Sequence, residues 1–137
     1  MIAFKHDDGG GEGDTIARAA AIFRAVSFDE TKGLSDAIKA DTEVRAKSYT
    51  GRVGQTLERM GFRRVKLARG VKPTLSQAYD QYGDCIVCSG NRVVCLKNGA
   101  LRDTTDLREY IIIDDKGNKT RRERKALAVW IDGPASA

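Results

Sequence analysis

The sequence predicts an α+β fold, with helices in the N-terminal part packed on a C-terminal antiparallel sheet. Up to Gly83, apolar residues recur at helical spacing behind residues that cap helices well. After Gly83, short apolar segments alternate with turn residues, as strands do. The length of 137 residues suits one domain with its own core. We therefore expect a single domain over 14–132, preceded by a flexible lead (1–13) and followed by a disordered tail (133–137).

Four helices are expected in the first part of the chain, each behind a residue whose side-chain oxygen accepts a backbone N–H of the first turn. Their N-cap residues, in chain order, are Asp14, Ser27, Thr50 and Thr74. Gly61 is expected to end the third helix. Thr74 and Gln77 form a capping box for the fourth, which should end near Tyr82.

The β-rich segments predict the strands of the sheet. They comprise residues 62–67, 84–88, 92–97, 109–114 and 126–131. The charged run DDKGNKTRRERK (114–125) is expected to join the last two as a hairpin tip.

Cys85 and Cys88 form a C-x-x-C pair, a spacing that holds zinc when it lies on a tight turn. Here the pair falls in an expected strand, where residues three apart point to opposite faces. The chain has only one other cysteine, Cys95, and one histidine, His6, in the expected lead. We therefore expect no metal and no other cofactor. The thiols should be buried and reduced, with Cys85 opposite Cys95 across a three-residue turn.

The formal net charge of +5 favours an acidic partner. Two basic clusters, 63–72 and 116–125, supply the candidate binding residues Arg63, Arg64, Lys66, Arg69, Arg121, Arg122, Arg124 and Lys125. Such clusters neutralise phosphates in nucleic-acid-binding proteins. These two lack the interleaved aromatic residues on which single-stranded bases stack, and they also suit a solvated strand edge and hairpin tip.

Two separated stretches carry motifs that occur together in one known family. GDTIARAAA (13–21) places Gly-Asp before an alanine-rich helix with an Arg-Ala pair. SGNRVVCLKNGALRDT (89–104) starts on a turn, passes an Asn-Gly turn and ends on Asp-Thr. Their order and spacing resemble small bacteriophage proteins with a papain-like cysteine-peptidase fold. The resemblance implies a papain-like minimal core and a role in the host cytoplasm.

The chain departs from that family at two of three catalytic positions. The family's cysteine nucleophile corresponds to Thr15, and its histidine to Asn91, while Asp103 matches the third group. A threonine hydroxyl does not ionise usefully near neutral pH and needs a strong general base. An asparagine amide is not such a base, so we expect no catalytic residues. Alternatively, residues 89–104 form an ordinary hairpin that never had chemistry.

The sequence therefore predicts a non-catalytic phage-type accessory protein that binds a host or phage macromolecule, including as an inhibitor of a host protein. A protein partner is favoured over nucleic acid, and Trp130, Tyr110, Tyr79 and Tyr82 are candidate anchors. Two alternatives stay open: nucleic-acid binding through the basic clusters, and a residual hydrolase that uses Thr15 or a cysteine. No apolar run is long enough for a membrane span, and the start lacks a signal-peptide layout, so a cytoplasmic location is expected.

Overall fold

The computed structural model describes residues 1–11, 13–41 and 47–133. As predicted, these residues form an α+β fold. The helices are α1 (Thr15–Arg24), α2 (Phe28–Ala40), α3 (Tyr49–Arg59) and α4 (Leu75–Tyr82). The strands are β1 (Ala3–His6), β2 (Phe62–Arg64), β3 (Cys85–Ser89), β4 (Arg92–Lys97), β5 (Ala100–Asp103), β6 (Glu109–Ile113), β7 (Lys119–Glu123) and β8 (Ala128–Asp132).

Within the described residues, six strands form one sheet in the order β1-β5-β4-β3-β8-β2. Neighbouring strands are antiparallel except β1 and β5, which run parallel with Ala3 opposite Ala100 and His6 opposite Asp103. The sheet is therefore mixed, which corrects the antiparallel sheet that we expected. The flexible lead was also wrong over 3–6, because β1 closes the outer edge of β5 and Ile2 beside it is buried.

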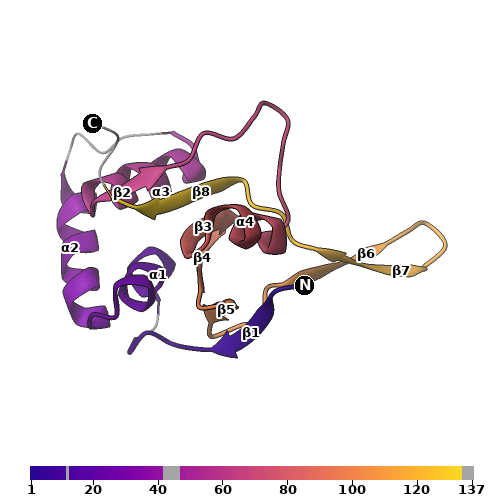
Figure 1. Cartoon of the computed structure of the whole chain (residues 1–137), viewed down its shortest axis with the longest axis horizontal. Coiled ribbons are helices and arrows are strands. Elements are labelled where there is room, and N and C mark those ends of the chain that lie inside the picture. Colours follow the sequence, from indigo (N-terminus) through magenta and orange to yellow (C-terminus); the bar gives the residue numbers. More distant parts are fainter. Residues whose placement is uncertain (12, 42–46, 134–137) are drawn as a thin grey trace.

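Helices cover both faces of the six-stranded sheet, and each face has its own apolar cluster. On one face, α1 and α3 pack on side chains that include Ile86 and Trp130. On the other face, Leu75 and Ala78 of α4 pack on side chains that include Val87. Figure 1 shows α1 and α2 on one side of the molecule, while β6 and β7 project from the other as a separate two-stranded hairpin. The central strands are thus buried on both faces, which explains their continuous apolar sequence.

The two cysteines of the C-x-x-C pair point to opposite faces, because Cys88 belongs to one apolar cluster and Cys85 to the other. The turn between β3 and β4 has two residues, Gly90 and Asn91, and Gly90 takes a φ of +62°. Cys85 therefore lies opposite Leu96, and the expected pairing with Cys95 is wrong by one residue. The three cysteines are buried and free.

Several element boundaries differ from those expected. Ser48, rather than Thr50, caps α3, because its Oγ accepts from the backbone N–H of Gly51 at 3.0 Å. The end of this helix is as expected, because it stops before Gly61, whose φ of +94° does not continue a helix. The strand expected over 62–67 ends at Arg64, and one further backbone hydrogen bond to β8 follows it, from Val65 N–H to Val129 O at 2.8 Å.

Within the run 114–125 that was expected as a hairpin tip, residues 119–123 form the strand β7, which pairs along β6. The tip itself is a turn in which Asp114 Oδ1 accepts from the backbone N–H groups of Lys116 at 2.9 Å and Asn118 at 2.8 Å. Residues 100–103 form the additional strand β5. Apart from Gly133, the tail expected to be disordered lies outside the described residues.

Candidate functional site

Thr15 is the first residue of α1, so its side chain stands at the positive end of the helix dipole. The residue before it, Asp14, caps the helix in an extended conformation, and its Oδ1 accepts from the backbone N–H of Ala17 at 3.0 Å. The local sequence thus places a hydroxyl at the helix start, where the resembled family has its cysteine.

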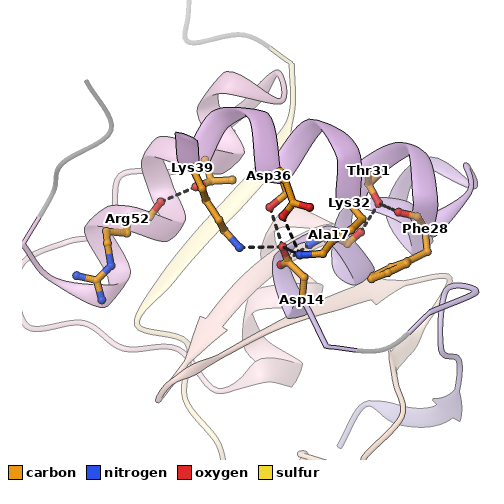
Figure 2. Close-up of polar contacts among 10 residues, drawn as sticks. Asp14, Ala17, Phe28, Thr31, Lys32, Asp36, Lys39 and Arg52 are labelled. Carbon is orange, nitrogen blue, oxygen red and sulfur yellow. Dashed lines mark hydrogen bonds and ion pairs between the residues drawn. The ribbon is translucent and has the colours of Figure 1, made fainter. Parts of the chain in front are cut away.

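The other carboxylate oxygen of Asp14 is held by α2 (Figure 2). Asp14 Oδ2 accepts from Ser35 Oγ at 2.7 Å and from Lys39 Nζ at 2.8 Å, and Lys32 Nζ lies 3.7 Å away. Burial alone would raise the pKa of Asp14. Hydrogen bonds from Lys39, Ala17 and Ser35 outweigh burial and lower that pKa to about 2. Asp14 is therefore a fixed anion that ties α1 to α2, and it is not a proton acceptor at neutral pH.

Asn91 lies in the turn between β3 and β4, and it lines one pocket together with Thr15. This pocket has a volume of about 420 Å³ and is lined by Gly13, Thr15, Arg18, Asn91, Arg92 and Thr104. A second pocket of about 440 Å³ also borders Thr15, and its lining includes Lys39, Tyr49 and Arg52. Thr15 therefore lines two pockets at the start of α1.

Asp103 ends β5, is buried, and pairs with two arginines that line this pocket. Its Oδ1 lies 3.5 Å from Arg18 Nε, and its Oδ2 lies 3.3 Å from Arg92 Nη2. Arg18 also donates from Nη1 to Thr104 Oγ1 at 3.0 Å. Thr15 and Asn91 therefore line the same pocket, and Asp103 contacts two arginines of its lining. The carboxylate in the third position pairs with guanidinium groups instead of orienting an imidazole.

No proton acceptor suited to Thr15 lines the two pockets within the described part of the chain. Tyr49 shares a hydrogen bond with the Thr15 side chain, but burial raises the pKa of Tyr49, so its phenol stays protonated at neutral pH. His6 is opposite Asp103 in the β1–β5 register, is exposed, and lines neither pocket. Among the described residues that line these pockets, none is a base that would activate the hydroxyl.

The thiols do not offer a substitute nucleophile. Burial raises the pKa of Cys85 to about 12, and it also raises the pKa of Cys88 and of Cys95. Each is a buried strand residue, whereas a reactive cysteine needs exposure and a stabilised thiolate. Among the described residues, no group of three or more histidine, cysteine or acidic side chains is placed to hold a metal ion.

The two basic clusters lie on different elements. Arg63 and Arg64 belong to β2, and Arg64 and Lys66 line a pocket of about 480 Å³, whereas Arg69 lies outside that lining. Arg121 and Arg122 are exposed on β7, and Lys125 is exposed just after it. Arg124 is half-buried, with its guanidinium carbon 5.8 Å from the centroid of the Tyr110 ring.

The anchor candidates have different surroundings. Trp130 is wholly buried in the core, and Tyr79 accepts at its hydroxyl from the backbone N–H of Gly99 at 2.9 Å. Tyr82 is half-buried and packs against one of the two apolar clusters. Tyr110, on β6, is exposed.

Three features of the site were missed at the sequence level. Arg18, Arg92 and Thr104 line the pocket although none was a candidate. Arg18 had a detectable signal, because it is a charged residue in a helix whose residues from Ile16 to Ile22 are all buried. Arg92 and Thr104 had no such signal, since strand-end polar residues are common.

Among the described residues, no helix is long and apolar enough to cross a bilayer. No protein-family model matches the chain, and neither a curated protein nor a solved structure matches it.

Proposed function

We propose that this chain is a non-catalytic accessory protein of bacteriophage type with a degenerate papain-like core. It acts by binding an acidic protein of host or phage origin, and one effect of this binding is to inhibit a host protein. The placement of Thr15 at the start of α1, with Asn91 and Asp103 nearby, supports the papain-like part of the proposal. The absence of a suitable base in the two pockets around Thr15 supports the loss of catalysis.

The single observation that carries the binding role is the surface of the β6–β7 hairpin. Ile111, Ile112 and Ile113 are consecutive and are 56 %, 43 % and 63 % exposed. Solitary apolar residues are ordinary on a protein surface, but a contiguous apolar strand on a projecting hairpin is typical of a surface that a partner covers. The outer edge of β6 also offers unpaired backbone groups to such a partner.

The positive charges on β7 favour an acidic partner. Ile111 pairs with Arg121, and Ile113 pairs with Lys119, so directly opposite residues form an apolar row beside a basic row on one face. A partner that presents apolar side chains next to carboxylates would match both rows. Opposite charges across such an interface speed association and exclude wrong partners.

A protein partner is favoured over nucleic acid because Glu109 and Glu123 face each other at the base of the hairpin, and Asp114 and Asp115 stand at its tip. These carboxylates would lie close to phosphates if a nucleic acid followed the whole hairpin, and like charges repel. The three exposed isoleucines also bring apolar area that phosphate binding does not use.

The proposal is tested by affinity capture from a lysate of phage-infected cells, with mass-spectrometric identification of what binds. The wild-type chain is compared with Ile111→Ser/Ile113→Ser and with Lys119→Ser/Arg121→Ser. The matched control is Lys66→Ser/Arg69→Ser, which removes two exposed positive charges elsewhere.

We expect one acidic protein to be retained by the wild type and the control and lost by both hairpin variants. Equal retention by all four proteins would contradict the role of the hairpin. Capture that disappears after nuclease treatment would instead support the nucleic-acid alternative.

A further inference from the structure

The pocket between Thr15 and Asn91 has the chemistry of an anion site. Two guanidinium groups, those of Arg18 and Arg92, line it together with the Thr15 and Thr104 side chains and the Asn91 amide. None of the described residues of its lining is acidic, and it opens at the N-terminal end of α1, where the helix dipole favours negative charge.

The hydrogen-bonding capacity of the two arginines is not used up by the fold. Both Nε atoms, of Arg18 and of Arg92, are buried and make no hydrogen bond within the described chain. Arg18 is only 5 % exposed, and its Nε is at ion-pair distance from Asp103 Oδ1 without donating to it. A buried N–H without an acceptor is costly, so the fold leaves both guanidinium groups short of acceptors. The Arg92 side chain is 32 % exposed, so a ligand in the pocket can reach its guanidinium group.

The charge balance indicates what kind of anion fits. Asp103 is the carboxylate that both arginines share, so among the described residues of this network two positive charges face one negative charge. The surplus of one positive charge matches a monoanion. A carboxylate meets this requirement, and its two oxygens match the fork of a guanidinium group. A phosphate monoester carries more negative charge than this surplus.

We propose that this pocket binds a carboxylate group, held by Arg18 and Arg92 with the Thr15 and Asn91 side chains beside it. The carboxylate belongs either to a small organic acid or to the end of a peptide. This site is distinct from the hairpin, and its ligand need not be the partner that the hairpin binds. In this proposal the position of the absent nucleophile serves recognition instead of catalysis.

The test follows the Nε–H and backbone N–H signals of the folded full-length chain by NMR at constant ionic strength. The probes are acetate, N-acetyl-alanyl-alanine with a free carboxylate, the C-terminal amide of the same dipeptide, and inorganic phosphate. We expect saturable shifts of the Arg18 and Arg92 Nε–H signals with one or both carboxylates and none with the amide. A response to acetate alone would identify a small-acid site, and a stronger response to the dipeptide a peptide-end site.

Two variants locate the site. Arg92→Gln removes a half-exposed guanidinium and should weaken carboxylate binding by about tenfold or more. Asn91→Ala, at an exposed turn position, should weaken it by a smaller factor, and it covers the case in which Arg92→Gln fails to fold. Arg69→Gln is the matched control and should bind as the wild type does.

Three results would each overturn the proposal. The first is equal shifts with the dipeptide acid and its amide. The second is unchanged affinity in both Arg92→Gln and Asn91→Ala. The third is tighter binding of inorganic phosphate than of either carboxylate. None of these results would affect the capture experiment on the hairpin. That experiment changes residues of β6 and β7, whereas this one changes Asn91 and Arg92.

Discussion

The Nε atom of Arg18 on α1 lies 3.5 Å from Oδ1 of Asp103 at the end of β5, and the two side chains are 6 % and 3 % exposed. This buried ion pair joins the first helix to the sheet. Removal of one partner from a buried pair leaves a charge without compensation, which is among the most destabilising single changes in proteins.

Asp103→Ala should therefore lower the free energy of unfolding by about 3–5 kcal/mol, because Arg18 would remain buried and unpaired. Asp132→Ala is the control, since Asp132 pairs with Arg24 at the surface with 66 % of its side chain exposed. The control should cost at most about 1 kcal/mol. Urea unfolding measures both values. Equal, small effects would show that the Arg18–Asp103 pair does not stabilise the fold.

Asp14 predicts an acid-dependent loss of stability. Its pKa of about 2 in the folded chain is below the ordinary value of 3.8, so the folded state favours the ionised carboxylate. The stabilisation is therefore present above about pH 4 and disappears as the pH falls through 2. Its size is about 1–2 kcal/mol after allowance for solvent screening.

Asp14→Asn keeps a capping oxygen but removes the titration, so its stability should fall less than that of the wild type between pH 4 and pH 2. Chemical unfolding at several pH values in this range makes the comparison. Parallel profiles for the two proteins would refute the assignment to Asp14.

Thr15 should be unreactive. A hydroxyl without a base does not attack an ester or amide at a useful rate, so native protein treated with an acyl-type activity probe should keep its mass. Thiol reagents should also leave the three cysteines unmodified until the chain unfolds, because they are buried. Stoichiometric labelling at Thr15, with turnover that Thr15→Ala abolishes, would identify the residual hydrolase that the sequence left open. A loss of that turnover in His6→Ala would identify the base.

The isoleucines of the hairpin should contribute little to folding. Ile111→Ser/Ile113→Ser changes two exposed side chains and should alter the free energy of unfolding by less than about 1 kcal/mol. Leu96→Ala, at a wholly buried position of β4, should cost about 2–5 kcal/mol. Thermal and urea unfolding of both variants give these values. A large loss in the hairpin variant would mean that the apolar strand is part of the core and not a binding surface.

The helices were predictable because their signals are local. Asp14, Ser27 and Thr74 each cap the helix that was expected behind them. The predicted N-cap of α3 was wrong by two residues. Ser48 and Thr50 offer the same hydroxyl chemistry, and only the path of the backbone distinguishes them.

The long-range features were not predictable in the same way. β1 has four residues, and its strand character comes from pairing with β5 about a hundred positions later in the chain. The ion pairs of Asp103 with Arg18 and Arg92 likewise depend on packing between α1, β4 and β5. The resemblance predicted that Thr15, Asn91 and Asp103 belong to one site and included Arg18 in its Arg-Ala pair, but it gave neither Arg18 nor Arg92 a role in that site.

The central claim is that the chain works by binding through the β6–β7 hairpin. Its most direct test is the dissociation constant of the captured partner, measured by calorimetry with purified proteins at fixed salt. Lys119→Ser/Arg121→Ser should raise this constant by about tenfold or more, while Lys66→Ser/Arg69→Ser should change it by less than about twofold. Equal dissociation constants for the two double variants would contradict the claim.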